Sequence, residues 1–190
     1  GYVYTLAVAP DSCIAAADQS GRKLVMFSPD GSFLKKMHPE KWGIVYRFMR
    51  SGNIVARDQN AIFDRSEGKN DTRLLVCLDK NARSLFDFAR AVGVKEKENN
   101  TTANTITFDL DSDDNTWIAF TYLNRIVKYS SSGKLMMMID RILPYKLSQK
   151  EGKYKFMGQT FPKTYMTVIR KGVASDTKNR IWEKGGREFF

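Results

Sequence analysis

The chain has 190 residues, of which 42% are hydrophobic and 12% aromatic, enough apolar material for a packed globular core. No apolar run approaches the roughly 20 residues that a membrane-spanning helix requires. One histidine, His38, excludes a metal site built from several histidines of this chain. Because the chain starts at Gly1 and ends at Phe190 directly after a strand signal, we expect it to be a piece of a longer protein.

The net charge of +10 is unevenly distributed along the chain. Residues 1–145 contain 20 Lys/Arg and 17 Asp/Glu, a surplus of 3, whereas residues 146–190 contain 11 and 4, a surplus of 7. Such a basic segment attracts a polyanion or an anionic membrane surface. The alternative is a solvated basic loop whose acidic counterpart lies elsewhere.

The first part of the chain predicts a four-stranded meander. Short apolar or alternating runs, separated by turn residues, indicate the strands. The expected strands are 5–9, 13–17, 23–27 and 32–37, with turns at 10–12 and 29–31. Asp, Ser and Gly in those turns bond their own backbone or accept left-handed dihedrals.

The same plan then recurs three times. The second copy has expected strands at 44–49, 54–57 and 73–78 and extends to 89, with residues 61–65 interposed. The third and clearest has strands at 105–110, 116–121, 125–129 and 134–139. A fourth begins at 172–176 and stops after Arg180-Ile181-Trp182.

Equivalent aromatic or apolar positions confirm that these units are repeats. Phe27, Leu78 and Tyr129 are spaced by 78 − 27 = 51 and 129 − 78 = 51 residues. One four-stranded meander cannot bury both faces, but several stacked around an axis can. We therefore predict an all-β chain, a β-propeller of four-stranded antiparallel blades with about three and a half blades present. An ordinary β-sandwich, which also has short strands at regular spacing, is the alternative.

In this interpretation the whole chain is one partial propeller domain. Its blades cover about 4–37, 44–89, 105–139 and 172–190, and a basic connection is inserted at 140–171.

The repeat resembles the NHL-type six-bladed propeller, and bacterial propellers of mostly unassigned function in particular. The resemblance rests on Asp111, the polar turn to Asn115, the aromatic Trp117, and Arg125-Ile126-Val127-Lys128-Tyr129 followed by Gly133 and Leu135. The chain departs from the pattern where Ala82 replaces a turn glycine and where Ser12, Asp114 and Asn179 stand in the first turn. The resemblance implies a bacterial protein exported to the periplasm or cell surface.

Ligands of propellers usually bind at one rim, where the second strands end. The polar residues expected there are Asp18, Arg22, Arg57, Asp58, Tyr122 and Asn124, with Gln19 beside them. The alternative is that these are ordinary solvated side chains. Similarity to lactonase-type propellers implies a central calcium held by Asp and Asn, but no residue of this chain is assigned to it.

Other residue types that carry chemistry give weaker signals. The acidic run Asp109 to Asn115 fails as a helix-loop-helix calcium site, because Asp114 stands at the sixth position and Phe120 at the twelfth. We expect a solvated turn there. Cys13 and Cys77 are expected to be small apolar residues in strands, although a disulfide stays open. His38 is expected in a loop, with no GxSxG motif to accompany it.

These observations favour a non-enzymatic propeller that binds a protein or small-molecule ligand and that pairs with missing blades or with itself. Two alternatives stay open. One is a lactonase- or lyase-like enzyme with a central calcium. The other is binding of single-stranded nucleic acid through residues 146–187, where Lys153-Tyr154-Lys155-Phe156 interleaves charges for phosphates with rings for bases. A plain hairpin that covers the propeller would explain the same residues.

Overall fold

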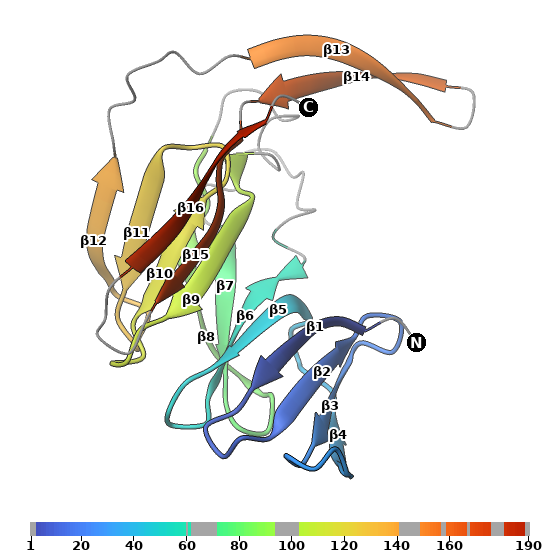
Figure 1. Ribbon diagram of the computed structural model, residues 1–190, viewed down its shortest axis with the longest axis vertical. Helices are drawn as coiled ribbons and strands as arrows, with labels where there is room; N and C mark the ends of the chain where they lie inside the picture. Colours follow the sequence, from blue (N-terminus) through green and yellow to red (C-terminus); the bar gives the residue numbers. More distant parts are fainter. Residues whose placement is uncertain are drawn as a thin grey trace. The chain divides into compact units, whose positions relative to one another are not determined.

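The computed structural model describes residues 3–59, 61, 72–93, 103–140, 149–156, 159–166, 168–175 and 181–188 (Figure 1). Within these residues the strands form three four-stranded antiparallel sheets and two two-stranded ones. Each four-stranded sheet is a meander, because consecutive strands are neighbours in it. The predicted all-β fold with four-stranded blades is confirmed.

The first sheet contains β1 (Val3–Val8), β2 (Ile14–Asp18), β3 (Lys23–Phe27) and β4 (Phe33–Met37). Alanines of β2 and leucine and methionine of β3 are buried, whereas most of β4 is exposed. The exposed outer strand carries Lys35 and Lys36, and such charges oppose pairing with another strand edge.

The second sheet contains β5 (Gly43–Phe48), β6 (Ile54–Asp58), β7 (Arg73–Leu78) and β8 (Ser84–Arg90). Residues 54–56 and 74–78 are buried without alternation. Burial on both faces of these strands means that other elements cover both sides of their sheet, which is what stacked blades require. Residues 62–65, predicted to interrupt this copy, lie outside the described residues.

The third sheet contains β9 (Ile106–Leu110), β10 (Thr116–Phe120), β11 (Arg125–Tyr129) and β12 (Leu135–Asp140). The two-stranded sheets are β13 (Gln149–Phe156) with β14 (Gln159–Met166), and β15 (Val168–Ser175) with β16 (Ile181–Glu188). β15 packs beside β9 and β10. The strand expected to begin at residue 172 begins at Val168 instead.

The strands fall into two compact units, residues 1–91 with 129–134 and residues 92–128 with 135–190. The first unit has a continuous apolar core, to which β1, β2, β3, β5, β6 and β7 all contribute. Leu24, Tyr46, Ile54, Val76 and Leu78 are among its buried residues. Edge-to-face packing of Phe88 on Tyr129, with ring centroids 5.6 Å apart, extends the apolar contacts of this unit.

In each of the three blades, the turn between the first two strands and the turn between the last two share one hydrogen-bond pattern. In the first turn, the N–H of Ala9 donates to the carbonyl of Cys13 and the N–H of Ser12 donates back to Ala9. The fourth residue of each turn has a positive φ, which favours glycine. These residues are Ser12 (φ 65°), Gly31 (88°), Gly52 (84°), Ala82 (64°), Asp114 (61°) and Gly133 (76°).

This shared conformation makes opposite predictions for Ser12 and Gly52. A residue with a Cβ loses about 1–2 kcal/mol of folding stability when its backbone is left-handed. Replacing it by glycine removes this cost, but glycine also has more conformational freedom in the unfolded chain, which offsets part of the gain. Ser12→Gly should raise the free energy of unfolding by about 0.5 kcal/mol. Gly52→Ala should lower it by about 1 kcal/mol, although an added Cβ would meet nothing within 4 Å. Urea denaturation of both variants checks this, and a shift of the same sign in both would contradict it.

Candidate functional site

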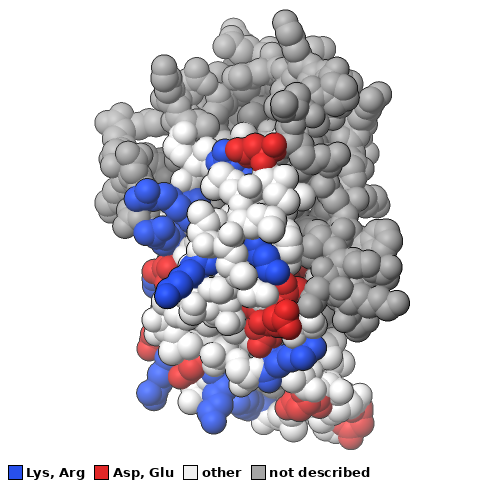
Figure 2. Space-filling model, turned by 90° about the vertical axis from the view of Figure 1, so that its left-hand side faces the viewer, with Lys and Arg blue, Asp and Glu red and all other residues white. Residues whose placement is uncertain are grey.

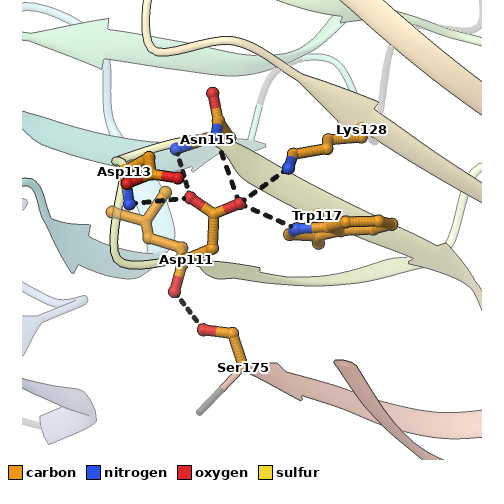
Figure 3. Close-up of polar contacts among 7 residues, drawn as sticks. Asp111, Asp113, Asn115, Trp117, Lys128 and Ser175 are labelled. Atoms are coloured by element: carbon orange, nitrogen blue, oxygen red, sulfur yellow. Dashed lines mark hydrogen bonds and ion pairs between the residues drawn. The ribbon is translucent and has the colours of Figure 1, made fainter. Parts of the chain in front are cut away.

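A dense cluster of polar contacts surrounds Asp111, in the turn between β9 and β10 (Figure 3). One carboxylate oxygen of Asp111 accepts the backbone N–H groups of Asp113 (3.0 Å) and Asn115 (2.9 Å). The other accepts the Asn115 amide at 3.2 Å and the Trp117 indole Nε1 at 3.1 Å.

A lysine from the next strand completes this cluster. Nζ of Lys128, on β11, lies 3.0 Å from Asp111 and 4.9 Å from the centroid of the Trp117 ring. The Asp111 side chain is completely buried, and 18% of the Lys128 side chain is exposed. The ion pair and the cation–π contact thus join three residues that the hairpin turn and two neighbouring strands bring together.

The electrostatics of Asp111 follow from these donors. Burial by itself would raise the pKa of Asp111, but the Lys128 ammonium and the hydrogen bonds from Asn115 and Trp117 outweigh it, so the pKa lies below its ordinary value. The carboxylate stays ionised near neutral pH. The turn itself is confirmed, but the prediction that it is solvated is wrong for Asp111, because Trp117 and Lys128 cover its side chain.

The strand β15 is attached beside the same turn. The Ser175 hydroxyl donates to the Leu110 carbonyl, and the Ser175 N–H donates to the Asp109 carboxylate at 3.0 Å. Figure 3 shows Ser175 approaching from β15 below the Asp111 turn. The acidic run thus fastens β15 to the third sheet through side chains and backbone together.

Among the predicted rim residues, Asp18 accepts several hydrogen bonds within one turn. It accepts the Ser20 hydroxyl at 2.7 Å and the N–H groups of Ser20 and Gly21 at 3.1 and 3.3 Å, and its other oxygen lies 3.2 Å from Lys23 Nζ. These bonds, led by the Ser20 hydroxyl and then Lys23, hold the pKa of Asp18 well below its usual range. Asp18 therefore closes the turn between β2 and β3.

The other predicted rim residues occur in local groups, one for each blade. Arg22 lies in the Asp18 turn with an exposed side chain and a φ of 45°. Arg57 and Asp58 end β6, where Asp58 pairs with Gly43 as Asp18 pairs with Val3 in the first blade. Tyr122 and Asn124 are half-buried between β10 and β11. Equivalent strand ends thus carry these residues, and their convergence on one binding surface stays a prediction.

The other candidate residues from the sequence are the two cysteines and the histidine, which lie in strands or directly beside them. Cys77 is buried in β7, and burial raises the pKa of its thiol to about 11. Cys13, expected in a strand, lies just before β2; burial and a hydrogen bond with Asp11 raise its pKa. Both cysteines are free thiols, and His38 lies in the connection after β4 as expected.

Three features bear on partners. Among the described residues, no group of three or more His, Cys, Asp or Glu side chains could hold a metal ion. No helix within the described ranges is long and apolar enough to cross a membrane. On the face in Figure 2, Lys and Arg alternate with Asp and Glu over the described residues, with no patch of a single sign. That mixture agrees with the small charge surplus of residues 1–145.

No protein-family model and no curated protein matches the chain. Solved structures do match it. One is streptogramin B lyase, with a TM-score of 0.54, 13% identity, and coverage of 96% of this chain and 48% of that one. Another, from Bacteroides fragilis and described as an exported protein, has a TM-score of 0.56, 12% identity, and coverage of 96% and 58%.

The chain thus spans about half the length of the structures it matches. At these identities the likeness concerns the fold and not the chemistry. Together with the three meanders and their shared turns, it leads to one conclusion: the chain has the β-propeller fold, built of four-stranded antiparallel blades.

Proposed function

We propose that this chain is a non-enzymatic binding module, a propeller scaffold that presents polar strand ends to a protein or small-molecule ligand. The observation that supports it most is the direction of the pKa shifts. The carboxyl groups of Asp18, Asp30, Asp111 and Asp140 have lowered pKa values, and the pKa values of Cys13, Tyr46 and Cys77 are raised.

Each of these shifts moves the pKa of the group further from neutral pH. General acids and bases work best with a pKa near the operating pH, and active sites are arranged to produce such values. Here the hydrogen bonds that lower the pKa values of the four aspartates close turns or join strands, and burial raises the pKa values of Cys13, Tyr46 and Cys77. Arg125 illustrates this, since its guanidinium binds both oxygens of Asp140 at 2.7 and 2.8 Å and lowers that pKa.

The ligand-facing residues of this proposal are Asp18, Arg22, Arg57, Asp58, Tyr122 and Asn124. Their support is the equivalence of the strand ends: Asp18 and Asp58 close β2 and β6 opposite the first residue of the neighbouring strand. Export from a bacterial cell belongs to the same proposal, and the exported protein from Bacteroides fragilis is its support.

An enzyme of the lyase type is the function against which the proposal is tested, because streptogramin B lyase has the same fold. Purified protein is incubated with streptogramin B, with calcium or magnesium and with EDTA, and the mixture is analysed by mass spectrometry. We expect no protein-dependent conversion and the same melting temperature, within about 1 °C, in calcium and in EDTA. Conversion above the no-protein control, or a rise of several degrees with calcium, would overturn the non-enzymatic proposal.

A further inference from the structure

The fourth strands of the three blades differ in how their exposed edges are protected. Each of them, β4, β8 and β12, lies at one end of its sheet and has an edge to which no other described strand pairs (Figure 1). Charged residues interrupt the apolar residues of β4 and β8, at Lys35, Lys36 and Asp87. Such charges oppose pairing with the edge of another strand. β12 has no charge within its five consecutive apolar residues, Leu135 to Ile139.

The apolar side chains of β12 are exposed along the whole run. Their exposed fractions range from 38% for Ile139 to 56% for Met136. Because successive side chains of a strand point to opposite faces, β12 exposes apolar surface on both of its faces. An apolar edge strand of this kind is a template for a strand of another chain, and burial of its side chains favours such pairing.

The apolar run of β12 is complementary to itself when two copies pair antiparallel about Met137. In that register Met137 lies opposite its own copy. Met136 then lies opposite Met138, and Leu135 lies opposite Ile139. Every apolar side chain of one copy therefore meets an apolar side chain of the other, and such cross-strand pairs stabilise a sheet.

The charges that flank this run complete the complementarity. Lys134 comes directly before β12 and Asp140 ends it, so the same register places each of them opposite the other in the second copy. The Asp140 side chain is 58% exposed, and a carboxylate that binds Arg125 through both oxygens still has further acceptor positions. A shift by one or two residues would place Lys134 opposite Ile139 or Met138. Parallel pairing in register would place like charges side by side, so the charges select one register and one orientation.

We propose that β12 pairs antiparallel with β12 of a second copy of this chain, about a two-fold axis at Met137. The two four-stranded sheets then form one continuous sheet, in which each β12 supplies the hydrogen-bonding partner for the edge of the other. The same surface of both copies forms the interface, so the assembly closes at the dimer. This interface is separate from the strand-end residues of the binding-module proposal, and either can fail without the other.

The first test places a charge on the proposed axis. Met137→Lys would set lysine against lysine in the dimer, whereas Leu34→Lys puts the same charge at an exposed position of β4 and is the matched control. Sedimentation velocity is measured at protein concentrations of about 5–200 µM, since a pair of edge strands buries less area than a standard interface. We expect the unaltered chain and Leu34→Lys to dimerise equally, and Met137→Lys to dimerise at least about 30-fold more weakly.

A charge exchange tests the register. Lys134→Glu and Asp140→Lys each set like charges opposite one another at both ends of the interface, so each variant alone should dimerise about 30-fold more weakly. An equimolar mixture of the two variants restores both pairs of opposite charge and should regain the dimer. Melting temperatures are measured for all variants. If Met137→Lys melts well below the unaltered chain, the charge exchange decides the question.

Three results would overturn the proposal. One is an unaltered chain that stays monomeric throughout, which would favour a cover for β12 from outside these 190 residues. Another is assembly into oligomers larger than a dimer, or an equal loss of association in Met137→Lys and Leu34→Lys. The third is a mixture of the charge-exchange variants that dimerises no better than either variant alone.

Discussion

Asp111→Ala should lower the free energy of unfolding by about 3 kcal/mol, the lower end of the range for breaking a buried ion pair. The variant leaves the Lys128 ammonium and the Trp117 indole N–H without their shared acceptor and removes two bonds to the backbone of the turn. The value is at the lower end because 18% of the Lys128 side chain reaches solvent. Urea denaturation followed by circular dichroism measures it.

Two controls make this result specific to the buried carboxylate. Asp114→Gly changes an acidic residue of the same turn and should be neutral or slightly stabilising, because Asp114 has a φ of 61°. The double variant Asp111→Ala with Lys128→Met should be less destabilised than the sum of its single changes, because no charge is then left unpaired. A loss under 1 kcal/mol for Asp111→Ala would mean that the cluster contributes little to the fold.

The same carboxylate gives the protein a pH dependence. The folded pKa of Asp111 is below its unfolded value of about 3.9, so its contribution is fully present above that value. The contribution is lost as the pH falls through the folded pKa. Unfolding free energies measured between pH 2 and 6 should therefore decline below about pH 4, and less steeply in Asp111→Ala. An equal decline in the two proteins would contradict this assignment.

Tyr46→Ala should destabilise the first unit by about 3–5 kcal/mol, as large aromatic residues do when they are truncated in a core. Tyr46 is 1% exposed and packs edge-on against Trp42, with ring centroids 5.9 Å apart. Its hydroxyl accepts the buried N–H of Gly43 at 3.0 Å, where the register between β5 and β6 shifts. The ring and the hydroxyl thus make separable contributions.

Tyr46→Phe separates them. It keeps the ring but leaves the Gly43 N–H without the hydroxyl, and should cost about 1–3 kcal/mol. Both variants are measured by urea denaturation at pH 7. If Tyr46→Phe were as destabilising as Tyr46→Ala, the hydrogen bond rather than the packing would dominate, and a loss under 1.5 kcal/mol for Tyr46→Ala would contradict the importance of this core position.

The repeat could be predicted from the sequence because its signals are local. A turn residue such as Gly31 or Gly133 and the apolar run beside it lie within one hairpin, and their recurrence shows the blade plan without knowledge of any distant contact. The turn position was also predictable where glycine is replaced, since Ser12, Ala82 and Asp114 all have the left-handed conformation that the aligned glycines imply.

The burial of Asp111 could not be predicted in this way. Four acidic or amide neighbours make the turn look fully hydrated, whereas the side chains that cover Asp111 come from β10 and β11. One feature of the sequence could have indicated this burial. Trp117 follows Asp111 in the repeat, and the indole N–H of a half-buried tryptophan needs a hydrogen-bond acceptor. The hydrogen bond from the Gly43 N–H to the Tyr46 hydroxyl lies where the register between β5 and β6 shifts, and the sequence pattern does not predict that shift.

We propose that the titratable groups with shifted pKa values stabilise the turns and strand pairs of this propeller and do not perform proton transfer. The most direct test is a carboxyl ¹³C NMR titration of the whole chain from pH 2 to 8. We predict that Asp18, Asp30, Asp111 and Asp140 all titrate below the ordinary value of about 3.9. A carboxyl group among these four that titrates between pH 5 and 8 would contradict the claim, because it would be poised for acid–base catalysis.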